Sequence, residues 1–436
     1  MEIYNAVSFS GIFVLMGVAW LVSESRRTVN ARVILWGTAL PLLFALFLFI
    51  VPAGARMFIV INDVLIRVLD SAAAGARFLF GRLALPPGAT GEGGETSLGF
   101  ILAFQAFPTI VFFSALMSIL YYGNILPRVI RGFAWLFTRL MKVSGAESLC
   151  TASNIFVGVE SALVIKPHLA GMTRSELAVV LTSGMATVAS NVLALYVFSL
   201  KDAFPMIAGH LVSASIIAAP CALVMSKLVV PEREVPPTLG VHIHPHYERE
   251  PNLVMAVIAG ANDGIRIIVG IVALLLAVLG LVALVDLALA YAGGFLNDAF
   301  GMQADWTLKG LLGWLFYPFA LVIGVPVEDA SLVARLIGER AIVTEVTAYR
   351  DLAAAMSQGA LHNPRSAVLA AYALCGFAHV ASMAIFIGGT AALAPQRAPV
   401  LASVGFRSLV AATLACLMTA CIAGTFLTRG SILMGG

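Results

Sequence analysis

The stretch from residue 144 to residue 167 most constrains what this chain can fold into, because it is apolar enough for a bilayer and yet carries charges. Its length of about 24 residues would suit one membrane-spanning helix. Glu147 and Glu160 lie within it, and Gly158 interrupts it. A carboxylate in hydrocarbon costs about 2.5–3.5 kcal/mol, so a plain spanning helix would avoid it. We therefore predict a re-entrant hairpin of two half-helices whose tip, at residues 157–161, turns inside the protein and lines a cavity.

The composition of the whole chain places it in a membrane. Of its 436 residues 60% are hydrophobic and only 11% are charged, which excludes an ordinary soluble domain. The net charge is only +3, with the basic residues standing between apolar runs, so no nucleic-acid partner is predicted. The cysteines lie in apolar segments without paired spacing, which favours buried free thiols over a disulfide or a zinc site. They are Cys150, Cys221, Cys375, Cys416 and Cys421.

The apolar runs predict an all-α polytopic membrane protein with about eight transmembrane helices, two re-entrant helical hairpins and three interfacial helices. The predicted spans are residues 6–22, 33–51, 99–122, 176–200, 206–229, 257–291, 367–389 and 401–427. The interfacial helices are predicted at residues 57–81, 127–142 and 306–324. The second hairpin is predicted at residues 327–352, which are too rich in charge to cross a bilayer.

Charges around the first apolar run orient the chain. This run follows Glu2 and precedes Arg26 and Arg27, whereas a secretory signal peptide begins with basic residues, so we predict a true span. Basic loops stay preferentially in the cytoplasm, and Arg32 adds to this one. We therefore expect a multi-pass protein of the cytoplasmic (inner) membrane, surrounded by lipid, with its amino terminus outside.

The sequence repeats itself. Arg174-Ser175 is followed by Gly-Met-Ala-Thr-Val-Ala-Ser at residues 184–190, and Arg365-Ser366 is followed by Gly-Phe-Ala-His-Val-Ala-Ser at residues 376–382. Each copy comes after an interfacial helix and a hairpin and before one more span. The count of spans makes the two units enter the membrane from opposite faces, which is an inverted-topology repeat with binding sites at the midplane. Chance similarity between Ala- and Val-rich helices is the alternative for the seven-residue match alone.

Charged side chains in the hairpins have simple structural interpretations. Glu147 and Asp329 open the two hairpins, and we expect them to cap the first helical turns. We expect Arg335 and Arg340 to pair with glutamates of their own segment, Glu328 or Glu339.

Several strings resemble the concentrative nucleoside transporters, nearly from end to end. They are residues 9–27, which end in SESRR, FQAFPTIVFFSALMSILYY at 104–122, SGAES at 144–148, GHLVSASIIAAP at 209–220 and YALCGFA at 372–378. The resemblance implies a homotrimer in which each protomer moves substrate past a scaffold. It implies an ion-coupled symporter, usually driven by sodium, that imports nucleosides, rather than an enzyme with a cofactor.

With this resemblance the chain divides into four parts. They are residues 1–125, scaffold spans with a periplasmic interfacial helix; 126–230, the first repeat of the transport domain; 231–306, a polar linker and a long scaffold span; and 307–436, the second inverted repeat. The linker carries alternate histidines at His242, His244 and His246, which could bind a metal. Pro245 favours a solvated loop instead.

The resemblance implies a sodium site on the first repeat. It maps onto Asn154 and the Val157 carbonyl at the hairpin tip, and onto Thr187 and the Val188 carbonyl on the following helix. A hard cation prefers oxygen ligands, and a broken helix exposes carbonyl groups that its own ladder does not use. Local capping and back-bonding are the alternative roles for the Asn154 and Thr187 side chains.

The concentrative nucleoside transporters recognise the base of their substrate with a Gly-Gln-Thr-Glu motif in the first hairpin. Here the string is Gly158-Val159-Glu160-Ser161, one residue shorter, with a valine instead of Gln-Thr and with Ala162 where a proline normally follows. Glu160 matches the family's glutamate. The amide and the hydroxyl that should flank it are missing.

The ribose side of the family's site maps onto the second repeat. Its acid falls on Glu345, its asparagine on His379 and its serine on Ser382, with Phe377 nearby. Carboxylates accept hydrogen bonds, and a histidine can donate, accept or titrate near neutral pH. By itself, a lone histidine in an apolar segment is more often a core residue. The predicted substrate-binding residues are Val159, Glu160, Ser161, Glu345, Phe377, His379 and Ser382.

The changed positions leave other functions open. A transporter of the same fold could couple to protons and carry a modified nucleoside or another sugar-bearing metabolite. An intramembrane hydrolase or transferase is a remote alternative, because the chain has no Gly-x-Ser-x-Gly elbow and no His-Glu-x-x-His helix.

Overall fold

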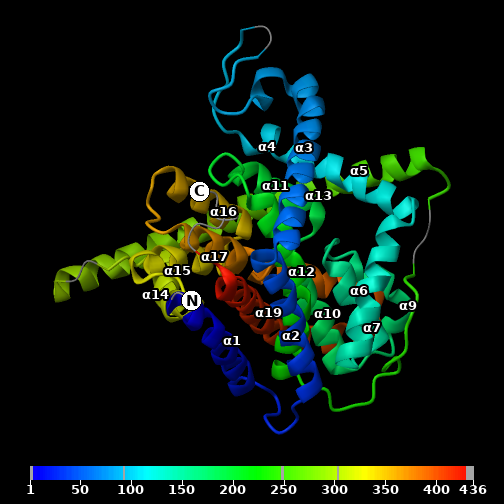
Figure 1. The fold of residues 1–436 in the computed structure, drawn as a ribbon. Coiled ribbons are helices and arrows are strands. Elements are labelled where there is room, and N and C mark those ends of the chain that lie inside the picture. Colours follow the sequence, from blue (N-terminus) through cyan, green and yellow to red (C-terminus); the bar gives the residue numbers. More distant parts are fainter. Residues whose placement is uncertain (1–2, 92–93, 247–249, 302–303, 429–436) are drawn as a thin grey trace.

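The computed structural model describes residues 3–91, 94–246, 250–301 and 304–428, and within them it is built from helices without a strand (Figure 1). This confirms the predicted all-α fold class. The first half contains α1 (Ile3–Leu21), α2 (Ala31–Ile50), α3 (Pro52–Phe80), η1 (Gly81–Ala84), α4 (Leu102–Gln105), α5 (Phe107–Tyr122), α6 (Ile125–Met141), α7 (Gly145–Asn154), α8 (Ser161–Val164), α9 (Lys166–Leu169), α10 (Arg174–Ala186) and α11 (Ser190–Leu200). The second half contains α12 (Ile207–Val229), α13 (Leu253–Phe300), α14 (Leu308–Val322), α15 (Val327–Ile342), α16 (Glu345–Ser357), α17 (Pro364–Leu374), α18 (Val380–Leu393), η2 (Pro395–Arg397) and α19 (Ala398–Phe426).

Seven segments of the described chain are helical, long and apolar enough to cross a membrane. They are Ile3–Leu21, Ala31–Ile50, Leu102–Tyr122, Arg174–Leu200, Ile207–Val229, Leu253–Phe300 and Pro395–Phe426. These segments coincide with seven of the eight predicted spans, as expected for a multi-pass membrane protein. The eighth prediction, residues 367–389, falls on α17 and α18, neither of which is long enough alone.

Two predicted continuous spans are broken in the middle, and both breaks fall in the repeated seven-residue motif. α10 ends at Ala186 and α11 begins at Ser190, whereas α17 ends at Leu374 and α18 begins at Val380. Hydropathy measures only how apolar a stretch of consecutive residues is, so it could not reveal either helix break. In the second break Gly376 adopts φ +134°, a backbone conformation that side chains of L-residues rarely allow.

Alanine at position 376 should therefore destabilise the second break. A Cβ atom there would lie 2.7 Å from both the Ala186 carbonyl oxygen and the Cys416 Sγ, in addition to the strained φ. We expect Gly376→Ala to lower the free energy of unfolding by on the order of 2–3 kcal/mol. Thermal unfolding in detergent measures this, with Gly388→Ala as the control, because a Cβ at Gly388 meets nothing within 4 Å. Equal midpoints for both variants would contradict the prediction.

Both hairpins form where they are predicted. The first turns between α7 and α8, and the second turns at residues 343–344 between α15 and α16. α7 begins with a capping box, in which the Ser144 N–H donates to Glu147 Oε1 (2.8 Å) and the Glu147 N–H donates to Ser144 Oγ (3.2 Å). The capping role of Glu147 is therefore confirmed.

The predicted role of Asp329 as a cap of its own helix is wrong. Its carboxylate accepts the backbone N–H groups of His362 (2.9 Å) and Asn363 (3.1 Å), and the Ser366 hydroxyl donates to it (2.6 Å). These groups lie at and just before the start of α17, which packs against α15. The side chain thus fastens the root of the second hairpin to the helix that follows it.

The predicted pairing of the two arginines within their own segment is also wrong. Arg335 pairs with Asp305, at 2.7 Å between Nη2 and Oδ2, and Arg340 donates from Nη1 to the Ala373 carbonyl (2.9 Å). Glu339 pairs instead with Lys309 of α14 (2.8 Å). Neighbours from α14, α17 and the preceding loop displace the local pairs that sequence proximity suggested.

The helix α1 shows that the two repeats have opposite orientations. Near its start, Arg365 at the beginning of α17 donates to Asn5 Oδ1 (2.9 Å). Just beyond its end, Glu24 pairs with Arg174 at the beginning of α10 (2.7 Å). A helix of 19 residues is about 28 Å long. The equivalent Arg-Ser pairs of the two repeats are thus held at opposite ends of one spanning helix, as an inverted repeat requires.

The predicted span at residues 257–291 is part of a much longer helix. α13 has 48 residues, about 72 Å in length, whereas the hydrocarbon core of a bilayer is about 30 Å thick. Its first half packs on α5, and its yellow-green end projects beyond the rest of the molecule in Figure 1. Large apolar side chains on the projecting half are exposed, among them Leu281, Leu284 and Leu287.

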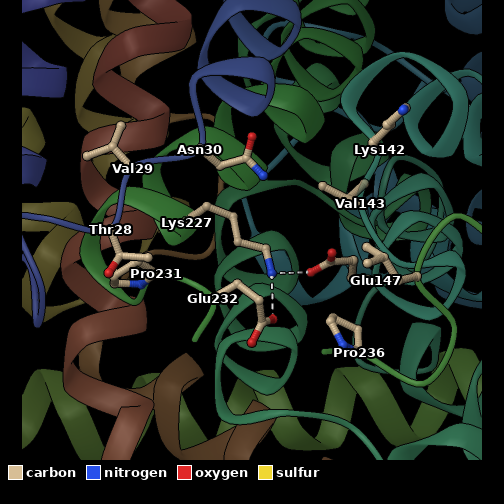
Figure 2. Close-up of a pocket in the computed structure, with 11 residues that line it drawn as sticks. Thr28, Val29, Asn30, Lys142, Val143, Glu147, Lys227, Pro231, Glu232 and Pro236 are labelled. Carbon is tan, nitrogen blue, oxygen red and sulfur yellow. Dashed lines mark hydrogen bonds and ion pairs between the residues drawn. The ribbon is translucent and has the colours of Figure 1, made fainter. Parts of the chain in front are cut away.

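A buried ion cluster holds the root of the first hairpin in place. Lys227, near the end of α12, is 7% exposed, and its Nζ lies 2.8 Å from Glu147 Oε2 and 3.2 Å from Glu232 Oε2 (Figure 2). The same Nζ donates to Ser175 Oγ (3.1 Å). The cluster borders a cavity of about 340 Å³ that Lys142 also lines. It joins α7, α10, α12 and the start of the linker.

Candidate functional site

The tips of the two hairpins line one cavity of about 540 Å³. Gly158, Val159 and Glu160 come from the first tip, and Thr344, Glu345 and Val346 come from the second. Both tip acids therefore face the same space, and the volume falls in the range of small-molecule sites. The remaining wall consists of Ala189, Asn191, Val192, Ile267, Gly270, Ile271, Leu274, Leu275, Phe377, His379, Ser382, Ile385 and Phe386.

Glu345 is held rigidly at the start of α16. The hydroxyl of Tyr196 donates to its Oε1 (2.6 Å), and His379 Nε2 lies 3.1 Å from its Oε2. The carboxylate is 3% exposed and stands in the first turn of its helix, where the helix dipole favours negative charge. The Tyr196 hydroxyl of α11 and the neighbouring His379 ring of the second break thus fix an acceptor at the wall of the cavity.

His379 is both a helix cap and a wall of the cavity. Its Nδ1 accepts the Ser382 N–H at 3.2 Å, so in the neutral ring the proton is on Nε2, which faces Glu345 Oε2 at 3.1 Å. The Ser382 hydroxyl lies against the carbonyl groups of His379 and Phe377. His379 and Ser382 thus lie at the start of α18, directly after the second break, and this position brings them to the cavity that Glu345 lines.

Glu160 lies between two cavities. It is exposed at the first tip, and a second cavity of about 450 Å³ shares Gly158, Glu160 and Asn191 with the first. The second cavity continues past α5 and α13, where Asp263 lines it, to His246 of the linker. The tip acid therefore borders both spaces.

Ser161 lies outside the cavity, unlike the other six predicted substrate residues. It is 2% exposed, and its Oγ accepts a weak hydrogen bond from the Cys150 thiol (3.7 Å). As the first residue of α8 it faces α7, because the shortened tip has already turned at Glu160. Sequence alignment with the family motif could not show this direction.

The four residues of the expected sodium site lie together at the first tip and the first break. The Ser190 N–H donates to the Phe156 carbonyl (2.9 Å), which joins the tip to the break. Asn154 Nδ2 donates to Ser183 Oγ (3.0 Å), whereas its Oδ1 is buried without a hydrogen-bond partner among the described residues. Thr187 Oγ1 donates back to the Ser183 carbonyl (2.8 Å), a bond that does not use its lone pairs.

These groups fit a hard monovalent cation. A buried amide oxygen without a donor, a hydroxyl oxygen and the carbonyls of Val157 and Val188 at interrupted helices are neutral oxygen ligands. In the part of the chain that the structure describes, no three His, Cys, Asp or Glu side chains are placed to hold a metal ion. All five cysteines are buried and free, as predicted.

Tyr196 and Asn191 are site residues that the sequence reasoning missed. Tyr196 donates a hydrogen bond to Glu345, and Asn191 lines both cavities. Both lie on α11, directly after the first break. A tyrosine and an asparagine in an otherwise apolar helix were the available signal, which the assumption of a continuous span obscured.

Three family models match consecutive parts of the chain. Residues 10–83 match "Na+ dependent nucleoside transporter N-terminus", residues 103–203 match "Nucleoside recognition", and residues 210–424 match "Na+ dependent nucleoside transporter C-terminus".

Curated relatives are about one third identical to the chain over the aligned residues. Solute carrier family 28 member 3 of Mus musculus is 34% identical over 434 residues, covering 96% of this chain and 58% of the relative. Sodium/nucleoside cotransporter 1 of the same species is 34% identical, with 97% and 64% covered. An uncharacterized transporter of Haemophilus influenzae is 34% identical, with 97% and 98% covered. The chain thus spans about three fifths of the mammalian relatives and nearly all of the bacterial one.

Solved structures show the same architecture. CNTnw in an inward-facing substrate-bound state superposes with a TM-score of 0.85 at 34% identity, covering 97% of this chain and 98% of the other. A variant of CNTnw in an outward-facing state gives 0.86 at 33% identity, with 98% of each chain covered.

Proposed function

We propose that this chain, which belongs to the family of Na+-dependent (concentrative) nucleoside transporters, imports nucleosides by symport with sodium. The observation that carries the proposal is the single cavity that two acid-bearing hairpin tips line from opposite repeats, on the same first tip as the buried Asn154 Oδ1, which has no hydrogen-bond partner among the described residues. The family consists of transporters, which confirms the prediction that the chain is not an enzyme.

The cavity offers a nucleoside complementary groups. Glu345 and Glu160 accept hydrogen bonds, and a ribose presents hydroxyl donors while a base presents N–H donors. Phe377 and Val159 add apolar surface for the flat base. We assign Glu345, with His379 and Ser382, to the sugar and Glu160 to the base, as the family pattern implies.

Asn154 Oδ1, the Thr187 hydroxyl and the carbonyls of Val157 and Val188 would hold the coupling ion. Sodium bound there supplies about 2.3 kcal/mol per 100 mV of membrane potential as the loaded site changes sides. The cation site and the substrate cavity share the first hairpin tip, so filling one orders the wall of the other. This shared wall is the physical basis that we propose for coupling.

A proton-coupled transporter is the second candidate. The observation that favours it is the contact of 3.1 Å between His379 Nε2 and Glu345 Oε2, a titratable pair at the cavity wall. In that case uptake would follow the pH gradient and persist when choline replaces sodium.

We further propose the orientation and assembly of the protein in the cytoplasmic membrane. The basic loop after α1 supports an amino terminus on the outside. α13 as a whole is longer than the bilayer requires. A homotrimer would cover its exposed apolar half.

The test combines binding with uptake. In purified protein we expect uridine or adenosine to raise the unfolding temperature in sodium but not in choline. In proteoliposomes we expect Thr187→Val to raise the sodium concentration for half-maximal uptake by about tenfold, because one oxygen ligand is lost.

Thr413→Val is the matched control, since Thr413 makes the same kind of bond to a carbonyl of its own helix, at 3.0 Å, in α19. Unchanged sodium dependence in Thr187→Val would remove this residue from the cation site. Uptake that needs a pH gradient and ignores sodium would favour the proton-coupled alternative.

A further inference from the structure

Two half-helices end close together in the interior, each with its carboxyl-terminal carbonyl groups. α10 ends at Ala186, whose carbonyl accepts a weak hydrogen bond from the Cys416 thiol (3.7 Å). A Cβ at Gly376, two residues after the end of α17, would lie 2.7 Å from the same carbonyl oxygen. Each helix end carries about half a negative charge. Two such ends in an apolar interior require positive charge nearby.

The first repeat meets this requirement with its cation site. Asn154, the last residue of α7, reaches the last turn of α10 through its bond to Ser183, and its buried Oδ1 has no hydrogen-bond partner among the described residues. The ligands are neutral oxygens, so the charge has to arrive with a bound ion.

The second repeat carries an arginine in the equivalent place. Arg340 lies near the end of α15 and reaches the last turn of α17, where it donates to the Ala373 carbonyl (2.9 Å). It precedes the tip acid Glu345 by five residues, as Asn154 precedes Glu160 by six. Arg340 is 0% exposed, and its Nε and Nη2 have no hydrogen-bond partner among the described residues.

We propose that Arg340 is a built-in cation that fills, in the second repeat, the position that the coupling ion takes in the first. The inverted repeat offers two such positions at converging helix ends, and the arginine closes one of them permanently. Each protomer then binds one coupling cation instead of two. The inference deepens the proposed function, because it sets the number of ions that accompany each solute.

Charge, rather than volume, is therefore the property that position 340 needs. Arg340→Lys keeps the charge and can keep the single hydrogen bond that is made, whereas Arg340→Met keeps much of the volume without the charge. We expect wild type and Arg340→Lys to bind one sodium ion per protomer in equilibrium binding of radioactive sodium without nucleoside. We expect Arg340→Met to bind a second ion and to unfold about 5 °C lower at low sodium.

Guanidinium provides a second measurement. Millimolar guanidinium should restore the unfolding temperature of Arg340→Met, because it can occupy the space and supply the charge. The control is Arg335→Met on the same helix, which loses an exposed pair with Asp305 and should not respond.

Each outcome decides the inference. If Arg340→Lys folds and Arg340→Met does not, charge is required and the inference holds. Equal behaviour of the two variants, with one sodium site and no rescue, overturns it, and so does failure of both to fold. If wild type binds no sodium, the proposed sodium coupling fails, whereas rescue by guanidinium still decides the role of Arg340.

Discussion

Replacement of Glu345 by glutamine is expected to reduce nucleoside uptake by at least about a hundredfold, the effect of losing a buried charged hydrogen-bond partner. One carboxylate oxygen accepts the Tyr196 hydroxyl, and the other lies 3.1 Å from His379 Nε2. The amide of the glutamine has only one oxygen, so its NH2 group would face either the Tyr196 hydroxyl or His379 Nε2. The variant therefore loses the charge, misorients the side chain and disorders the wall that contacts the solute.

Uptake of radiolabelled uridine into proteoliposomes measures this effect, and thermal shift with uridine separates binding from transport. Glu328→Gln is the matched control, because Glu328 is an exposed glutamate of the same hairpin. Near-normal uptake by Glu345→Gln would exclude this acid from the substrate site.

Replacement of Lys227 by methionine should destabilise the root of the first hairpin by about 3–5 kcal/mol, the usual cost of leaving a buried charge without its partner. Glu147, at 1% exposure, would lose the ammonium group 2.8 Å away. The unfolding temperature should fall by about 3–5 °C. Thermal unfolding of the purified protein in detergent measures the shift.

Two further variants identify the cause of the destabilisation by Lys227→Met. Lys142→Met changes an exposed lysine that lines the same cavity, and its unfolding temperature should stay close to that of wild type. Lys227→Met combined with Glu147→Gln should be more stable than Lys227→Met alone, because the uncompensated carboxylate is gone. A double variant that is no more stable than the single one would show that lost packing, not charge, explains the effect.

The site was only partly predictable from the sequence. Glu160, Glu345 and His379 stood out because polar side chains in apolar segments are costly unless they are used. The partners of these residues could not be recognised in the same way. Tyr196 is 149 residues from Glu345, and no local sequence pattern indicates that the two are in contact. Ser161 had the right position in the motif, but the turn of the shortened tip directs it toward α7.

The sequence by itself determined the membrane environment, the two hairpins and the inverted repeat. It did so because the cost of placing charges in hydrocarbon, and the order of elements along the chain, are both local quantities. Only the tertiary structure decided where the spans break, that Asp329 and Arg340 hold α17 instead of their own helix, and that two distant tips share one cavity. These features depend on contacts between segments far apart in the chain, and a window of neighbouring residues carries no information about them.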